Sequence, residues 1–300
     1  MPRPSAIGIG AQKCASSWIH AVLAAHPQGA VAKDKELDFF SYYFDHGYRW
    51  YESLFDADSP ATVHFENSPS YFYDPRAPER VRAYDPAMKI LLLLRDPVER
   101  AYSNHLHEVI KGHIPADLPF EAGLQNNPTY LEQSRYGKHL ARWLEVFPPE
   151  QVLVLLAEDI KRDPAAQARR VYEFLGIDPD FTTGLLAERR NESDRARLPW
   201  LRKLLRAQGD WMRNAGLEEQ LMRLKKLPPF RQLLAANRVD VRAEVAPMRP
   251  ETRQHLVAEL GGEMQRLAGL IGREPVEWAS WTAMQTSAEV APPAGAVRHG

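Results

Sequence analysis

The sequence predicts an α/β fold, in which a parallel β-sheet is flanked by helices and followed by a mostly helical C-terminal part. Two observations predict it. Short apolar segments alternate with helical segments between about residues 5 and 180, which is the pattern of strand–helix–strand units. In one segment, residues 89–95, nearly every side chain is apolar, as is typical of a strand inside a parallel sheet.

Five segments are expected to form the strands of this sheet. Residues 6–9 are short and apolar and run directly into a turn that contains glycine and serine. Residues 62–65 alternate between polar and apolar side chains. The full set comprises residues 6–9, 30–32, 62–65, 89–95 and 151–156.

Capping residues and prolines set the expected helix boundaries. Serine is a favoured N-cap, so the first helix is expected to start at Ser16 and to end before Pro27. A second helix is expected over residues 97–110, because proline fits the first helical turn. A third is expected over residues 163–176, which begin with Asp-Pro and end with a glycine suited to a C-cap.

The C-terminal part, residues 199–272, is helical in pattern, basic and interrupted by prolines. Its apolar residues form two stripes at helical spacing, which are Trp200, Leu201, Leu204 and Leu205, and Leu256, Leu260, Met264, Leu267, Leu270 and Ile271. The tail, residues 286–300, is rich in Ala, Pro and Gly and is expected to be flexible. We expect one domain over residues 1–285, with its core in residues 5–180.

Composition limits the partners. Of 300 residues, 38 are Lys or Arg and 39 are Asp or Glu, so the net charge of -1 offers no global field to recruit nucleic acid. An anion must therefore be bound by a local arrangement of positive groups. The single cysteine excludes a disulfide framework and fits a reducing cytoplasm. Neither a signal-peptide pattern nor an apolar run of about 20 residues occurs, so no membrane span is expected.

The first segment that carries chemistry is Gly10–Trp18. A turn between a buried strand and a helix exposes backbone N–H groups at the positive end of the helix dipole, which suits a phosphate or phosphosulfate. Lys13 adds a full charge, and Ser16 and Ser17 add hydroxyl donors. The lysine follows Gly10 by three residues with no second glycine before it, unlike the phosphate loop of nucleoside triphosphatases. A strand–helix turn with a capping serine is the alternative interpretation.

The second segment is Lys35–Phe40, which follows the expected strand at residues 30–32. The carboxyl edge of a parallel sheet is where ligands bind in open α/β folds. Glu36 is therefore a candidate general base. A solvated cluster of charges is the alternative.

The third segment begins with Arg95, at the end of the strand over residues 89–95, and includes Ser103, two turns into the next helix. The guanidinium fork and the serine hydroxyl together suit a second phosphate. A single arginine after a strand is otherwise a surface or ion-pair residue. Its coincidence with the other two segments makes it informative.

Together these segments resemble the sulfotransferases that use 3′-phosphoadenosine 5′-phosphosulfate (PAPS), and in particular the branch of heparan sulfate sulfotransferase domains and their bacterial relatives. Residues 10–17 resemble the family's 5′-phosphosulfate loop, G-x-x-K-x-G-T-T, and residues 35–40 resemble its K-E-x-H-F-F. Its 3′-phosphate motif, R-x-P-x-x-R-x-x-S, is matched at Arg95, Pro97, Arg100 and Ser103. The stretches 47–51, 65–72 and 174–176 are also similar. The resemblance covers about residues 5–180 and implies a P-loop-like fold.

The resemblance also implies residue roles. Glu36 would accept the proton of the acceptor, and Lys13 would neutralise the charge that builds on the leaving 5′-phosphate. His107, one turn after Ser103, matches a histidine of the N-sulfating branch and is either an aid to proton handling or a buried helix residue. PAPS would contact Gly10, Gln12, Lys13, Cys14, Ala15, Ser16, Ser17, Trp18, Arg95 and Ser103. No metal is required.

Two residues of the loop leave alternatives open. Trp18 either stacks on adenine or packs in the core. Cys14 is either a reactive thiol at a helix N-terminus or a small packing residue, and packing is favoured.

Several positions depart from the family pattern. Ala15 replaces a glycine, and Ser16 and Ser17 replace two threonines but keep the hydroxyls. Asp38 stands where a histidine is frequent, and Asn67 stands where heparan-type relatives carry lysine, which disfavours a polyanionic acceptor. The loop that closes over PAPS is assigned to residues 191–197.

The expected function is sulfuryl transfer from PAPS to a hydroxyl or amine of a small metabolite, by a cytoplasmic and bacterial enzyme. Sulfation of a glycan or of protein tyrosine is an alternative, as is a non-catalytic PAPS- or glycan-binding module. A small-molecule kinase is a further alternative, and the loop sequence argues against it. The oligomeric state stays open, with a homodimer among the alternatives.

Overall fold

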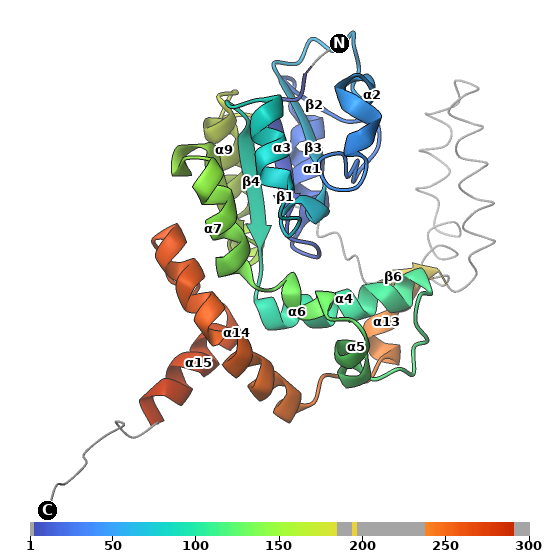
Figure 1. Ribbon diagram of the computed structural model, residues 1–300, viewed down its shortest axis with the longest axis vertical. Helices are drawn as coiled ribbons and strands as arrows, with labels where there is room; N and C mark the ends of the chain where they lie inside the picture. The colour runs from blue at the N-terminus through green and yellow to red at the C-terminus, as the bar shows by residue number, and fades with distance from the viewer. Residues whose placement is uncertain (1–2, 185–193, 197–237, 291–300) are drawn as a thin grey trace, which may run out of the picture. The chain divides into compact units, whose positions relative to one another are not determined.

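The structure is a computed structural model that describes residues 3–184, 194–196 and 238–290 (Figure 1). Its main sheet has five parallel strands in the order β2-β3-β1-β4-β5. The strands are β1 (Ala6–Gly10), β2 (Gly29–Val31), β3 (Val63–Asn67), β4 (Lys89–Leu94) and β5 (Val152–Leu156). All five lie where the sequence predicts a strand, and the predicted α/β class is confirmed.

Helices fill the connections between the strands. The first half of the chain holds α1 (Ser16–Ala25), η1 (Phe44–His46), α2 (Gly47–Ser53), η2 (Pro69–Tyr71), α3 (Ala77–Tyr84) and α4 (Pro97–Lys111). The second half holds α5 (Phe120–Asn126), α6 (Thr129–Glu132), α7 (Tyr136–Val146), η3 (Pro149–Gln151), α8 (Ala157–Arg162), α9 (Pro164–Leu175), α13 (Val241–Glu244), α14 (Pro250–Ile271) and α15 (Ala279–Val290). A short antiparallel pair joins β6 (Asp194–Ala196) and β7 (Arg238–Asp240).

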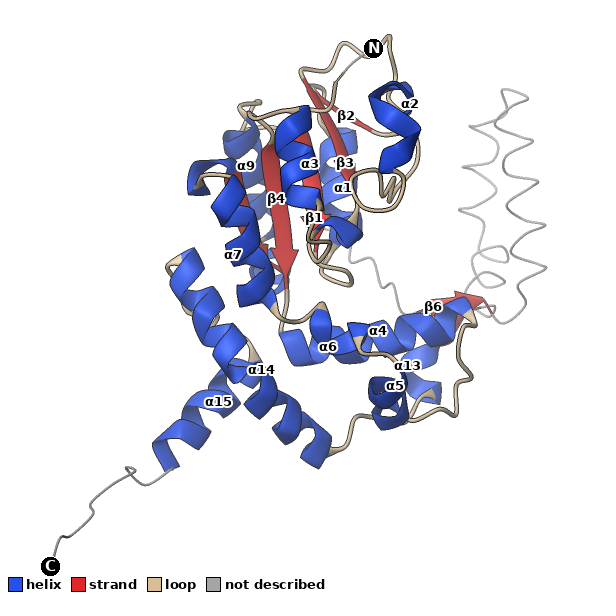
Figure 2. Cartoon of the chain, viewed as in Figure 1, coloured by secondary structure: helices blue, strands red, loops and turns tan. Residues whose placement is uncertain are grey.

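Both faces of the main sheet are covered. Helices α3 and α7 lie on one face and α1 and α9 on the other, as Figure 2 shows with the strands in red between blue helices. The His26 ring at the end of α1 lies 4.6 Å from the Tyr172 ring of α9, which agrees with that placement. Because both faces are covered, every residue of β3 is buried, although polar and apolar side chains alternate along it.

The chain divides into two compact units. The first comprises residues 1–104, 124–190 and 248–300 and contains the five-stranded sheet. The second comprises residues 105–123 and 191–247 and contains the β6–β7 pair. The predicted stripe at residues 200–205 lies outside the described residues.

Helix α14 confirms the second apolar stripe over most of its length. Leu256, Leu260, Met264 and Leu267 are buried. Gly137 of α7 allows the close packing of α14, because a Cβ there would lie 2.8 Å from the Cβ of Arg266. The stripe was extended too far, however. Leu270 is 37% exposed, since it lies in the last turn of the helix.

The flexible tail was predicted to begin at residue 286, and the last helix of the structure extends into the start of that range. Helix α15 continues to Val290. Residues 286–290 contain no proline or glycine to end the helix. The hydroxyls of Thr286 and Ser287 donate to the carbonyls of Thr282 and Ala283, one turn earlier. The rest of the tail lies outside the described residues.

The start of α1 differs from the prediction in one respect. Ser16 is the first helical residue, and the N-cap is Ala15, which has φ 68° and ψ 26° and gives no side-chain cap. A side chain in this left-handed conformation costs free energy that glycine does not incur.

The strain at Ala15 gives a testable prediction. Ala15→Gly is expected to raise the free energy of unfolding by about 1 kcal/mol, because glycine adopts φ 68° without a Cβ clash. The matched control is Ala21→Gly in the middle of the same helix, which is expected to lower it by about 0.5–1 kcal/mol. Urea unfolding measures both. Destabilisation by both substitutions alike contradicts the strained conformation.

Candidate active site

The topology marks one place on the rim of the sheet. Of the neighbouring strands β1 and β4, β1 is followed by α1 on one face of the sheet, whereas the chain after β4 passes through α4, α5 and α6 before α7, which lies on the other face (Figure 1). In open α/β sheets ligands bind at the carboxyl ends of such a pair of strands. The first and third predicted segments, which begin at Gly10 and Arg95, emerge there.

The loop after β1 is shaped to present backbone N–H groups. Gly10 has φ 139°, and a Cβ on it would lie 3.2 Å from the carbonyl oxygen of Pro69, so only glycine fits easily. Lys13 and Ala15 both have φ 68°. Helix α1 starts without a side-chain cap, and the Trp18 N–H donates to the Ala15 carbonyl, so the N–H groups of Ser16 and Ser17 are left for an anion. Lys13, Ser16 and Ser17 around them are partly exposed.

The second segment lies beside this loop. The Lys35 Nζ donates to the Ser17 Oγ at 2.9 Å, which joins residues that the chain separates by a strand and a helix. Glu36 is exposed at the same rim, and its backbone N–H donates to the carbonyl of Asn67 at the end of β3. The structure therefore brings the candidate base to the edge that carries the loop.

The third segment lies on the other side of the loop. The Arg95 Nη1 donates to the Lys13 carbonyl at 3.4 Å. Arg95 Nε is buried and has no hydrogen-bond partner among the described residues. Ser103 lies two turns into α4 and is 9% exposed. A guanidinium N–H that is buried and unpaired is poised for an acceptor that the protein does not supply.

Arg100, which belongs to the same motif, serves the protein itself. It is fully buried and donates to the Ser134 Oγ at 2.8 Å, to Gln133 and to the Tyr130 carbonyl. It fixes the start of α4 to the α6–α7 segment. The sequence motif did not reveal this division of labour between its two arginines.

Other loop residues pack rather than react. Cys14 is fully buried, its Sγ lies 3.8 Å from the Tyr136 hydroxyl, and burial raises its pKa to about 11. The favoured interpretation of Cys14 as a packing residue therefore agrees with the structure, and the reactive thiol does not. Trp18 is half-buried and packs against the core, and Gln12 is partly exposed.

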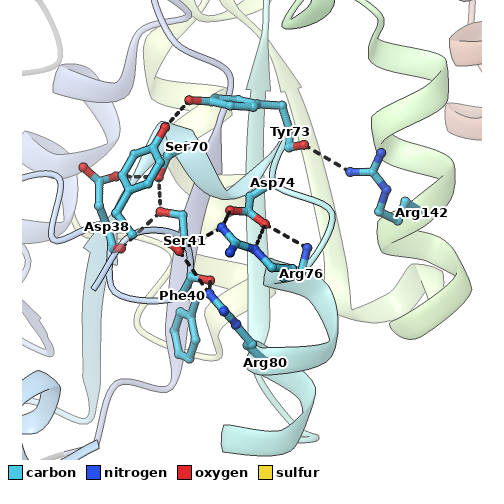
Figure 3. A network of polar contacts seen from close by, with 10 residues as sticks. Asp38, Phe40, Ser41, Ser70, Tyr73, Asp74, Arg76, Arg80 and Arg142 are labelled. Carbon is cyan, nitrogen blue, oxygen red and sulfur yellow. Dashed lines mark hydrogen bonds and ion pairs between the residues drawn. The ribbon is translucent and has the colours of Figure 1, made fainter. Parts of the chain in front are cut away.

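Residues 38–41, which follow Glu36 in the chain, form a polar network with the β3–α3 connection and with α3 itself (Figure 3). The Ser70 Oγ donates to the Asp38 carboxylate at 2.5 Å and lies 2.7 Å from the Ser41 Oγ. The Arg80 guanidinium donates to the carbonyls of Phe40 and Ser41. Burial raises the pKa of Asp38, and the nearby charge of Glu36 adds to that effect.

The structure also shows an acid to which the sequence assigned no role. Glu66 lies on β3, is 2% exposed, and has a pKa raised to about 7 by burial. The Ser68 Oγ donates to its carboxylate at 2.7 Å and the Tyr51 hydroxyl at 3.2 Å. The only sequence signal was its place in the stretch 65–72, which resembles the family.

Two further predictions fall on other parts of the chain. His107 is half-buried in the part of α4 that belongs to the second unit, and its role stays a prediction. Of the loop assigned to residues 191–197, only 194–196 are described, as strand β6.

The site fits a nucleotide with phosphate at both ends. The uncapped N-terminus of α1 and Lys13 suit one anionic group. The unpaired Nε of Arg95 suits another, and the Arg95–Lys13 contact places it beside the same loop. Among residues 3–184 and the other described stretches, no group of three or more His, Cys, Asp or Glu could hold a metal ion.

Comparison with known proteins agrees with this geometry. The model of the sulfotransferase domain family matches residues 3–197. The human heparan sulfate glucosamine 3-O-sulfotransferase 3B1 is 34% identical in an alignment of 181 positions that covers 58% of this chain and 46% of that protein. The human bifunctional heparan sulfate N-deacetylase/N-sulfotransferase 3 is 33% identical in an alignment of 201 positions that covers 59% of this chain and 23% of that protein. The chain thus spans less than half the length of these curated relatives.

A solved structure shares the fold over nearly the whole chain. It is a sulfotransferase from Alicyclobacillus acidocaldarius, with a TM-score of 0.67 and 24% identity over 94% of this chain and 100% of that one. The chain belongs to the sulfotransferase domain family, and its class is that of the PAPS-dependent transferases. No described helix is long and apolar enough to cross a membrane.

The titration of Glu66 gives a testable prediction. Tyr51, Tyr71 and Asp38 are the titratable groups that face it, and its folded pKa of about 7 lies above the ordinary 4.5. Between these values the folded protein holds a proton that the unfolded chain has released. The contribution of Glu66 to stability is therefore complete below pH 4.5 and is lost as the pH rises through about 7.

Glu66→Gln removes this titration. The free energy of unfolding of the wild type, minus that of the variant, is expected to fall by roughly 2–3 kcal/mol between pH 4.5 and 8. Urea unfolding at a series of pH values measures the difference, in which the other titrating groups cancel. A difference that does not change with pH contradicts the buried, raised-pKa carboxyl.

Proposed function

We propose that this chain transfers the sulfuryl group of PAPS to a hydroxyl or amine of a small acceptor at the rim formed by β1, β3 and β4. One observation carries the proposal. The Lys35–Ser17 and Arg95–Lys13 hydrogen bonds join three segments that are far apart in the chain, and each supplies one part of the required chemistry. A non-catalytic binding module would need the residues that bind the phosphates but would not need a carboxylate at Glu36.

Each phosphorylated end of the nucleotide is held by positively charged groups and hydrogen-bond donors. The N–H groups of the α1 first turn, with Lys13, Ser16 and Ser17, take the 5′ end. Arg95 and Ser103 take the 3′-phosphate, which distinguishes PAPS from nucleotides that lack it. Gly10, Gln12, Cys14 and Ala15 shape the loop. Trp18 is placed to line it on the α1 side.

Catalysis is assigned to two side chains. PAPS supplies an activated sulfuryl group when it is bound. Glu36 takes the proton from the acceptor, and its exposure leaves it accessible to that acceptor. Lys13 neutralises charge on the 5′-phosphate side, where positioning and electrostatics lower the barrier. His107 is kept as a further candidate for proton handling.

The acceptor is proposed to be a small metabolite without dense negative charge. Asp38 and Glu36 place two carboxyl groups at the acceptor side, and Asn67 gives no positive charge there. Such a rim repels a polyanion. The named relatives act on heparan sulfate, so a glycan is the second candidate, and protein tyrosine is a third. A cytoplasmic location and a bacterial source stay predictions, and the oligomeric state stays open.

The base role is tested by Glu36→Gln. This variant is expected to lower kcat for sulfuryl transfer from labelled PAPS by about 10²–10⁴-fold, because the acceptor proton loses its acceptor. The affinity for the product, 3′-phosphoadenosine 5′-phosphate (PAP), is expected to stay within about threefold. The measurement pairs a screen of acceptors by label transfer with calorimetry of PAP binding.

The matched control is Asp34→Asn, which removes an exposed carboxylate from the same loop and is expected to leave both quantities unchanged. Equal losses of turnover and of PAP binding in Glu36→Gln would refute the base role. A wild type that binds PAP but transfers label to no acceptor supports the non-catalytic module instead.

A further inference from the structure

The loop that carries Glu36 is held in an unfavourable backbone conformation. Glu36 has φ 59° and Asp38 has φ 51°, and neither is a glycine. Left-handed residues of this kind cost free energy and persist only where the surroundings fix them. Leu37 and Phe39 are buried, but the Glu36 side chain is exposed, so packing of that side chain does not fix its conformation.

Hydrogen bonds from the loop backbone fix it instead. The Asp38 N–H donates to the Ser68 Oγ at 2.9 Å, and the Phe39 N–H donates to the Tyr71 hydroxyl at 2.9 Å. The Glu36 N–H donates to the Asn67 carbonyl at 3.2 Å. Every acceptor lies in the short stretch from the last residue of β3, Asn67, to the last residue of η2, Tyr71.

Both hydroxyl acceptors are oriented by one carboxyl group. The Ser68 Oγ donates to Glu66 at 2.7 Å, and the Tyr71 hydroxyl also hydrogen bonds to Glu66. A hydroxyl has a single proton and two lone pairs. Because its proton points to Glu66, each hydroxyl turns a lone pair to the loop N–H. Glu66 thus orients the two hydroxyls so that each donates to the carboxyl group and accepts from a loop N–H.

We propose that Glu66 is a positioning residue for Glu36: its carboxyl group orients the Ser68 and Tyr71 hydroxyls so that they hold the backbone of residues 38 and 39, and thereby the base, at the rim of the sheet. The inference rests on the proposed function of Glu36. The arrangement of the loop itself does not, and it can be tested without PAPS or an acceptor.

Amide hydrogen exchange tests the arrangement directly. Glu66→Leu removes both acceptor oxygens at similar volume, and exchange at Glu36, Asp38 and Phe39 is expected to accelerate at least tenfold relative to the strands of the sheet. Glu66→Gln keeps an oxygen that can face Ser68, so its effect is expected to be smaller. The matched control is Tyr51→Phe, which removes a hydroxyl that also bonds Glu66 but holds no loop amide, and is expected to leave the loop protected.

Two milder variants keep the test decisive if Glu66→Leu does not fold. Ser68→Ala is expected to expose the Asp38 amide selectively, and Tyr71→Phe the Phe39 amide. Loop protection that is the same in these variants and in the wild type overturns the proposal.

A kinetic cycle separates positioning from a general structural effect. In the wild type, Glu66→Leu is expected to lower kcat by about 10–100-fold with the KM for PAPS within about twofold. In the Glu36→Gln background it is expected to lower the residual rate less than twofold. An equal loss in both backgrounds overturns the positioning role. Full turnover by Glu36→Gln itself would instead refute the proposed base.

Discussion

The hydrogen bond from the Arg95 guanidinium to the Lys13 carbonyl joins the ends of the two strands on which the site depends. Strands β1 and β4 are neighbours in the sheet, so the segments that follow them start close together. Their connections then leave to opposite faces, which keeps the rim between them open to a ligand rather than filled by a helix. The uncapped start of α1 and the Arg95 guanidinium therefore meet at one place.

The surrounding structure holds the end of β4 in position. The Asp96 carboxylate accepts from the Val98 and Glu99 N–H groups at the start of α4 and also from the Ser280 N–H of α15. The Trp278 indole donates to Glu158 after β5 at 2.9 Å. The C-terminal helices are thus fastened to the same rim. This rigidity lets Arg95 keep an unpaired, buried N–H, which would otherwise be an unfavourable arrangement.

Local signals in the sequence were sufficient for the strands and for the three site segments. Apolar runs such as residues 89–95 and the proline at position 97 determine local structure directly, and the order of strands and helices determines which edge the site occupies. The role of Glu66 was not predictable in this way. It depends on how the Ser68 and Tyr71 hydroxyls meet a loop some 30 positions earlier in the chain, so no local pattern expresses it.

The prediction of Ser16 as the N-cap of α1 was wrong for a related reason. Ser16 is a good capping residue by propensity, but the loop needs a left-handed residue before the helix and leaves the first N–H groups uncapped. Arg100 and Arg95 look equivalent in the motif, and only their hydrogen-bond partners in the folded protein distinguish them: Arg100 donates to Ser134, Gln133 and Tyr130, whereas the buried Nε of Arg95 has no partner among the described residues. Such departures from local preference fall where the chain is built to meet a ligand.

The central claim is that the α1 loop and Arg95 clasp the two phosphorylated ends of one nucleotide, and calorimetry of Arg95→Ala tests it most directly. The wild type is expected to bind PAP with a stoichiometry of one. The variant is expected to lose about 10–100-fold in affinity for PAP, but less than about threefold for adenosine 5′-phosphosulfate, which has no 3′-phosphate. Arg82→Ala, on the exposed side of α3, serves as the control. Equal weakening of both nucleotides, or no binding of PAP by the wild type, would contradict the account.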